Sequence, residues 1–176
     1  MRTVLAAFNV MELIDPHFKK NPVPYIVQSL LALVSLFIIL FFIESLTQAV
    51  IVAALGASTF IVFTMPHSVT AQPRRLIGGH LIGIVVGSLC HLALYNSNLI
   101  STNASPAVAI FVYALAVALS MFLMAITSTE HPPAAATALG ILIYNGDSSA
   151  IPAIIIFTIA LAIVRRMLRR YLVDLF

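Results

Sequence analysis

The sequence predicts an all-α protein, a polytopic membrane helix bundle with about six membrane segments, and three observations support this fold class. The 176 residues are 61% hydrophobic and 9% charged, with a mean hydropathy of +1.09, which lies outside the composition of soluble globular domains. Apolar runs close to bilayer length recur along the chain. Lys and Arg gather at the ends of these runs, so the expected partner is the lipid bilayer and not nucleic acid.

Two regions are predicted. Residues 1–24 form a cytoplasmic or interfacial N-terminal segment, whose early apolar side chains suit a helix lying on the membrane surface. Residues 25–172 form a single transmembrane domain. Its apolar segments, in order, are 25–43, 49–65, 76–95, 106–126, 132–144 and 150–164.

The fifth segment is too short to cross a bilayer alone. Residues 132–144 would make about 20 Å of helix, whereas a hydrocarbon core is about 30 Å thick. Pro132 and Pro133 disfavour helical backbone before them, so the incoming helix should stop between residues 127 and 131. We therefore expect a helix break within the membrane, facing protein or water instead of lipid.

Basic residues predict the orientation. Lys19 and Lys20 precede the first segment, Arg74 and Arg75 precede the third, and four arginines follow the last. The connections on the opposite side, 44–48, 96–105 and 145–149, carry no Lys or Arg. Both termini are therefore expected in the cytoplasm.

The two halves of the chain show a faint similarity. A polar break containing Glu44 precedes Ala53-Ala-Leu-Gly56, and one containing Glu130 precedes Thr137-Ala-Leu-Gly140. Two interpretations stay open. The halves form an inverted 3+3 repeat, a transporter pattern with the site at the repeat interface, or small residues common in membrane helices produce the similarity by chance.

Several short motifs occur together in a fixed order. They are Gly56-Ala-Ser58, Pro66, Ala71-Gln-Pro-Arg74, Gly79-His80 and His131-Pro-Pro133 followed by Ala-Thr-Ala-Leu-Gly140. In this combination the chain resembles the HPP family of integral membrane proteins over roughly residues 25–170. Arg75 and Ala135 depart from the residues usual in that family, Asn and Gly.

The resemblance implies a function and a location. Plastid and cyanobacterial members of the family are associated with nitrite transport. We therefore expect a transporter or channel for a small inorganic anion, with nitrite as the expected substrate, no cofactor and no enzymatic activity. The expected location is the inner (plasma) membrane of a bacterium or cyanobacterium, or the plastid envelope in a eukaryote.

The predicted substrate site joins two groups of polar and small residues around the helix break. An ionisable group at membrane depth costs about 2.5–3.5 kcal/mol on insertion scales, so it usually marks a polar path. A helix start also attracts anions through its free amides. The alternative roles are capping of the broken helix and close helix packing. The predicted residues are Gly56, Ser58, Thr59, Gln72, His80, Glu130, His131, Pro132, Pro133, Ala134 and Thr137.

Gly79, Gly83 and Gly87 recur every four residues and predict a smooth helix face for tight packing, within the chain or in a homo-oligomer. Two other functions compete with transport. One is a sensory or scaffolding module that moves no solute. The other is a haem- or metal-binding redox protein, because His80 and His91 would lie nearly on one helix face.

Overall fold

The computed structural model describes residues 15–43, 48–96, 106–144 and 149–175. Within these ranges the regular elements are all helical, which confirms the predicted fold class. The elements are α2 (Pro16–Lys20), α3 (Val23–Phe41), α4 (Ala49–Thr64), the 3₁₀ turn η1 (Val69–Ala71), α5 (Pro73–His91), the π-helical turn η2 (Leu92–Asn96), α6 (Pro106–Ile126), α7 (Pro133–Ile143) and α8 (Ala150–Leu168).

Prolines set several helix starts, as their fixed backbone angle and missing N–H favour the first helical turn. Pro73 begins α5 three residues before the predicted segment, and Pro133 begins α7. The last helix differs most from prediction, because α8 continues past Arg165 and Arg166 to Leu168. Arg166 is exposed, and the buried Arg165 donates to the Pro66 carbonyl, so neither charge ends the helix.

Four helices in the described ranges are long and apolar enough to cross a membrane: α3, α5 with its π-helical extension, α6 and α8. The α4 helix has 16 residues and α7 has 11, so both are short. The chain is thus an integral membrane protein. The number of crossings and the cytoplasmic termini remain predictions, and the expected surface helix in residues 1–14 and the break at Glu44 lie outside the described residues.

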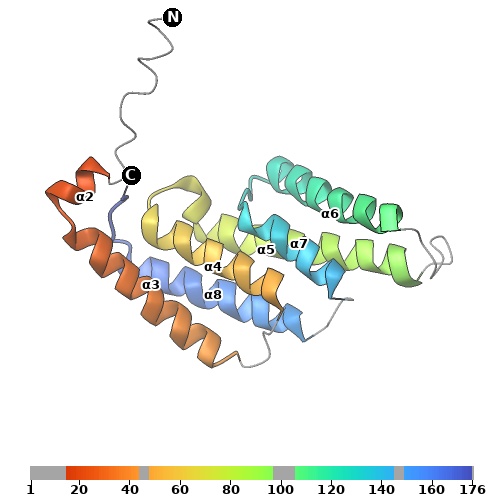
Figure 1. The fold of residues 1–176 in the computed structure, drawn as a ribbon, viewed down its shortest axis with the longest axis horizontal. Coiled ribbons are helices and arrows are strands. Elements are labelled where there is room, and N and C mark those ends of the chain that lie inside the picture. Colours follow the sequence, from red (N-terminus) through yellow and green to blue (C-terminus); the bar gives the residue numbers. More distant parts are fainter. Residues whose placement is uncertain (1–14, 44–47, 97–105, 145–148, 176) are drawn as a thin grey trace, which may run out of the picture.

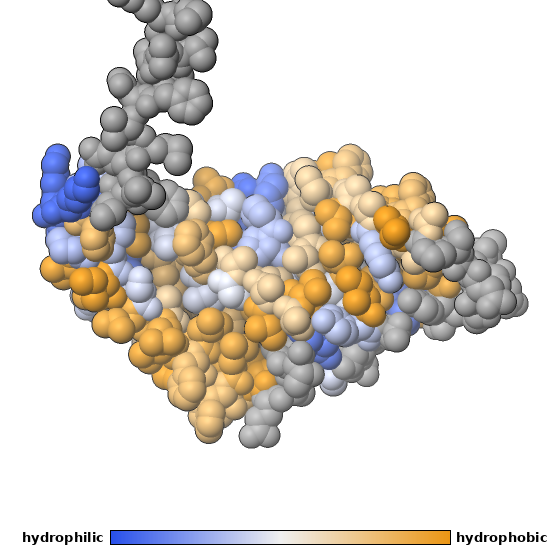
Figure 2. All heavy atoms as spheres, in the orientation of Figure 1, coloured by the Kyte–Doolittle hydropathy of each residue, from blue (hydrophilic) through white to orange (hydrophobic). Residues whose placement is uncertain are grey.

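The helices α4, α5, α7 and α8 lie at the centre of the bundle, and α3 and α6 lie on opposite flanks (Figure 1). Both flanking helices expose large apolar side chains, including Phe37 on α3 and Phe111 on α6, each 65% exposed. Figure 2 shows hydrophobic residues spread over α3 and hydrophilic ones gathered at α2. In a membrane protein, such exposed apolar faces contact lipid.

The pattern of helix packing supports an internal repeat. The helix pairs with substantial contact correspond between the halves: α3–α4 with α6–α7, α3–α8 with α5–α6, and α4–α8 with α5–α7. The remaining pairs, α4–α7 and α5–α8, each correspond to themselves. Exchanging α3, α4 and α5 for α6, α7 and α8 leaves this set unchanged. Two equivalent halves related by a twofold axis require this property, so the packing favours the repeat over chance similarity.

The glycine face of α5 packs against α7 of the same chain. A Cβ atom added at Gly79 would lie 2.8 Å from the His131 Cβ, and one at Gly83 would lie 2.4 Å from the Ala134 carbonyl oxygen. At Gly87 it would lie 2.6 Å from the Ala138 carbonyl oxygen. The predicted tight packing is therefore present within the chain, where α7 covers this face, and a homo-oligomer stays a prediction.

Candidate functional site

The break before α7 is built by a Schellman motif at the end of α6. The Thr129 amide donates to the Met124 carbonyl over 2.9 Å, and the Ser128 amide donates to the Ala125 carbonyl over 3.3 Å. Ser128 has a φ of 53°, the left-handed backbone that this motif needs. The αL residue of this motif is usually glycine, so a serine at position 128 did not predict the motif. The predicted stop before residue 131 is confirmed, since α6 ends at Ile126.

The start of α7 differs from the expected anion cradle. The Ala134 amide donates to the His131 carbonyl over 2.9 Å, and the Ala135 amide donates to the Pro132 carbonyl over 3.2 Å. These donors are therefore already paired by tight turns. The expectation that Ala134 offers a free amide to an anion is wrong, because the two prolines start a turn whose own carbonyls accept these hydrogens.

Four of the predicted site residues form one buried hydrogen-bonded chain. Ser58 on α4 lies at its centre: its Oγ is 3.0 Å from His80 Nε2 and 2.9 Å from His131 Nε2. His80 Nδ1 lies 2.8 Å from Thr137 Oγ1 on α7, and His131 Nδ1 lies 2.9 Å from the Thr70 carbonyl oxygen. The four side chains are at most 1% exposed. We call Ser58, His80, His131 and Thr137 the polar network.

The direction of each hydrogen bond follows from the Thr70 carbonyl, which can only accept. His131 therefore carries its proton on Nδ1, and a neutral His131 accepts at Nε2 from the Ser58 hydroxyl. Since that hydroxyl has one hydrogen, His80 must donate to it from Nε2, and Thr137 then donates to His80 Nδ1. With both histidines neutral, every nitrogen in the polar network has a partner.

Glu130 is separate from this network. It forms an ion pair with Arg75, and the Arg74 guanidinium donates to the Thr127 carbonyl over 3.2 Å. The Glu130 side chain is 44% exposed. Both arginines at the start of α5 thus hold the segment between α6 and α7. This tertiary role was not predicted from the sequence, which placed Arg74 and Arg75 mainly as topology anchors.

Other predicted site residues lie apart from the polar network. A Cβ added at Gly56 would meet nothing within 4 Å. The Thr59 hydroxyl donates to the Leu55 carbonyl of its own helix over 3.0 Å. Gln72 is exposed and precedes α5. Pro132 is exposed and Pro133 is buried, and these two shape the break instead of lining the network.

Gln28 and Arg165 are buried polar residues that the sequence prediction did not include. Gln28 on α3 donates to the carbonyls of Phe63 and Val173 over 2.6 and 3.0 Å, and it accepts from the Val173 amide over 2.7 Å. Arg165 on α8 donates to the Pro66 carbonyl over 2.6 Å. An amide inside the apolar run 25–43 was the available signal for Gln28. Gln28 thus joins the end of α4 to the C-terminal segment, and Arg165 holds the connection after α4.

One of two pockets reaches the polar network. One of about 320 Å³ lies beside the break and is lined by Met121, Met124, Ala125, Glu130, His131, Pro132 and Ala135. His131 therefore lines this pocket, and the rest of the lining is largely apolar.

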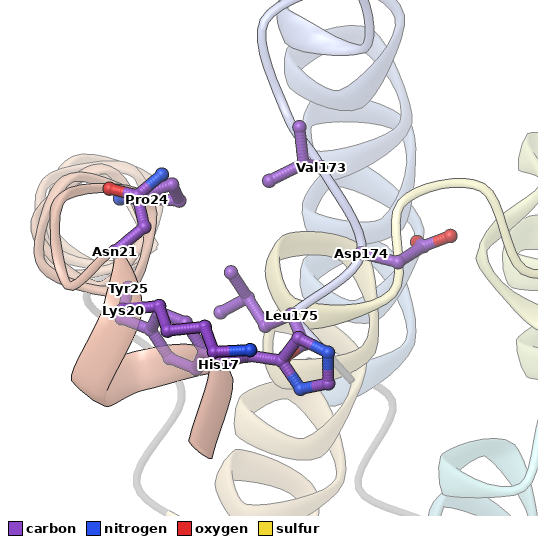
Figure 3. A pocket seen from close by; sticks show the side chains of 8 residues that line it. All are labelled: His17, Lys20, Asn21, Pro24, Tyr25, Val173, Asp174 and Leu175. Carbon is purple, nitrogen blue, oxygen red and sulfur yellow. The ribbon is translucent and has the colours of Figure 1, made fainter. Parts of the chain in front are cut away.

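The second pocket, of about 330 Å³, lies between α2 and the C-terminal segment (Figure 3). His17 and Lys20 from α2 face Asp174 and Leu175 across it. The Tyr25 hydroxyl donates to Asp15 over 2.6 Å, which holds the pKa of Asp15 below its usual value. This pocket shares no lining residue with the polar network.

Ligand-type side chains do not gather into a metal site in the described part of the chain. No group of three or more His, Cys, Asp or Glu side chains suitable for a metal ion occurs in residues 15–43, 48–96, 106–144 and 149–175. The nearest histidine pair is His80 and His131, with ring centroids 5.3 Å apart. Both Nε2 atoms are already within hydrogen-bond distance of Ser58.

Comparisons with known proteins agree with a membrane protein. The family model described as "HPP, transmembrane region" matches residues 18–172. A transmembrane protein of Dictyostelium discoideum is 47% identical over 90 residues, covering 51% of this chain and 29% of that protein. A second transmembrane protein of the same organism is 40% identical over 89 residues, covering 51% of this chain and 26% of that protein. The matched part thus spans less than a third of these relatives. No solved structure matches.

Proposed function

The chain belongs to the HPP transmembrane family, and from this premise we propose that it is a membrane transporter or channel for a small inorganic anion such as nitrite. The proposal includes no cofactor and no chemical conversion of the anion. It places both termini in the cytoplasm. The membrane would be the inner membrane of a bacterium or cyanobacterium, or the plastid envelope in a eukaryote.

The observation that carries the proposal is the position of the polar network. It joins α5 to the two shortest apolar helices, α4 and α7, which pack against each other. Burying two imidazoles and two hydroxyls in a membrane domain is costly unless all are hydrogen-bonded. Transporters built from repeats bind their solute where interrupted helices of the two halves meet. Exchanging the halves maps α4 onto α7, so the contact between these two short helices is the corresponding place in this chain.

The chemistry of the network suits a small anion. Ser58 and Thr137 hydroxyls and the imidazole N–H groups can turn toward an acceptor, and Glu130 has its charge offset by Arg75. An anion entering past the Met121 and Met124 pocket would reach His131 first. It would then replace the bonds between Ser58 and the two imidazoles with bonds to its own oxygens.

Uptake into proteoliposomes tests the proposal. The parent protein should accumulate nitrite faster than protein-free vesicles, and Ser58→Ala should lower the rate about tenfold or more, because a hydrogen bond to an anion is lost. Ser120→Ala is the matched control: that hydroxyl is also buried, but it donates over 2.8 Å to Val117 of its own helix.

The alternative functions predict different results. A sensory or scaffolding module would be folded and correctly inserted but would give no uptake above that of protein-free vesicles. A haem protein would show a Soret band in the visible spectrum of the purified sample. Either result would refute anion transport as proposed.

A further inference from the structure

The Ser58 hydroxyl has more acceptors around it than hydrogens. Its oxygen lies 3.0 Å from the Ala54 carbonyl oxygen, in addition to His80 Nε2 at 3.0 Å and His131 Nε2 at 2.9 Å. A hydroxyl donates one hydrogen and can accept two. It can therefore point at His131 or at Ala54, but not at both.

Each orientation corresponds to one protonation state of His131. When Ser58 points at His131, that imidazole is neutral, with its only hydrogen on Nδ1 toward Thr70. When Ser58 turns to the Ala54 carbonyl, its oxygen must accept from both imidazoles, so His131 carries hydrogens on Nδ1 and Nε2 and is an imidazolium. In both states every hydrogen-bond donor and every ring nitrogen of the polar network has a partner, and no heavy atom moves.

The added charge is not compensated by nearby carboxylates. The described segments α4 and α7 contain no titratable side chain, and α6 contains only Tyr113. On α5 the groups of this kind are Arg74, Arg75, His80, Cys90 and His91. Glu130, adjacent in sequence, is already paired with Arg75. A protonated His131 is thus a net positive charge inside a membrane domain, which is costly without a counter-ion.

Building on the proposed function, we propose that the Ser58–His131 pair binds one proton together with one monovalent anion, so that the protein carries the two together without net charge. The anion supplies the negative charge that the imidazolium needs, and it accepts the hydrogen on His131 Nε2 in place of the Ser58 oxygen. The proton comes from water and adds to the lone pair of His131 Nε2. The Ser58 O–H bond rotates and does not break, and release of the anion returns the proton.

Proteoliposomes with separately imposed pH and voltage gradients test this coupling. With the voltage held at zero, an acidic exterior should drive nitrite inward, and one pH unit should sustain about a tenfold accumulation, because one proton moves per anion. With equal pH on both sides, a voltage of either sign should leave the uptake rate unchanged. Protein-free vesicles supply the baseline, since nitrous acid crosses lipid unaided.

The variant His131→Gln removes the titrating group and keeps a side chain that can donate and accept. It should lose the pH-driven uptake above the baseline, whereas Ser120→Ala should keep it. The variant Ser58→Ala removes the acceptor for the imidazolium and should reduce the same signal about tenfold or more. Folding of each variant is checked by the reaction of Cys90, which is buried, with a thiol-reactive dye on heating.

The outcomes separate the two proposals. Uptake that follows voltage and ignores the pH gradient would overturn proton coupling and leave anion transport standing. Full pH-driven uptake by a folded His131→Gln protein would also overturn the coupling. The absence of uptake under every gradient would instead refute the proposed function.

Discussion

The α5–α7 contact gives a sharp prediction at Gly83, where an added Cβ would meet its neighbour at the shortest distance among the described glycines. A Cβ at this position would lie 2.4 Å from the carbonyl oxygen of Ala134 and 3.3 Å from the Thr137 Cβ. The first atom belongs to the backbone of α7, so no side-chain rotation relieves the overlap. Gly83→Ala therefore has to move one helix away from the other.

The size of the effect follows from this overlap. Real Cβ atoms essentially never approach another atom closer than 3.0 Å, so the 2.4 Å separation must grow along α5 and α7. Overpacking of this kind costs about 1–3 kcal/mol of stability. The shift also carries Thr137 away from His80, whose contact is 2.8 Å long. We expect lower stability and a lower rate of nitrite uptake in the same variant.

Gly56→Ala is the matched control. Gly56 also lies in the interior of an apolar helix, but a Cβ there would meet nothing within 4 Å. Alanine favours helix over glycine by about 0.5–1 kcal/mol, so this substitution should be neutral or stabilising. The assay is the temperature at which Cys90, the single cysteine and a buried one, reacts with a thiol-reactive dye.

The two glycines must differ for the reasoning to hold. If Gly83→Ala unfolds at the same temperature as the parent, α5 and α7 are not packed as closely as the structure has them. If Gly56→Ala is destabilised as much as Gly83→Ala, the effect belongs to glycine in general and not to the helix contact.

Three further predictions follow from the contacts. Gln28→Leu should lower the free energy of unfolding by about 1–3 kcal/mol, because three backbone groups lose their hydrogen-bond partner. The same thiol assay measures this, and an unchanged unfolding temperature would contradict it. Thr137→Val should leave His80 Nδ1 without its donor and lower nitrite uptake severalfold, unlike Ser120→Ala. On a Cys90→Ala background, an impermeant reagent outside cells should label Ser149→Cys but not Gln72→Cys, and the reverse pattern would refute the cytoplasmic placement of the termini.

Helix positions could be predicted well where the local signal is strong. The segment 106–126 coincides with α6, because a proline starts it and a long apolar run fills it. The break before residue 131 was also predictable, since two adjacent prolines have few compatible backbone conformations. These features depend on the backbone geometry of proline and on the hydrophobicity of a continuous segment, and both are properties of residues adjacent in sequence.

Contacts between distant segments were less predictable. Ser58 meets His80 across 22 residues of sequence and His131 across 73, and no spacing rule connects them. The sequence therefore grouped Glu130 with His131, whereas the structure pairs Glu130 with Arg75. The glycine face of α5 was recognised, but the sequence did not identify α7 as its partner, because a smooth face suits any close neighbour.

The two halves of the repeat differ at matched positions. The set of packed helix pairs is unchanged when the halves are exchanged. The surroundings of the matched glycines differ, however: a Cβ added at Gly140 would lie 2.6 Å from the Ile51 side chain, whereas one at Gly56 would meet nothing within 4 Å. Thr137, which contacts His80, corresponds to Ala53 in the other half. The halves share the pattern of packed helix pairs but differ in polarity, so the close α5–α7 contact, and not the shared pattern, gives the polar network its geometry. The first half contributes Ser58, so neither half forms the network alone.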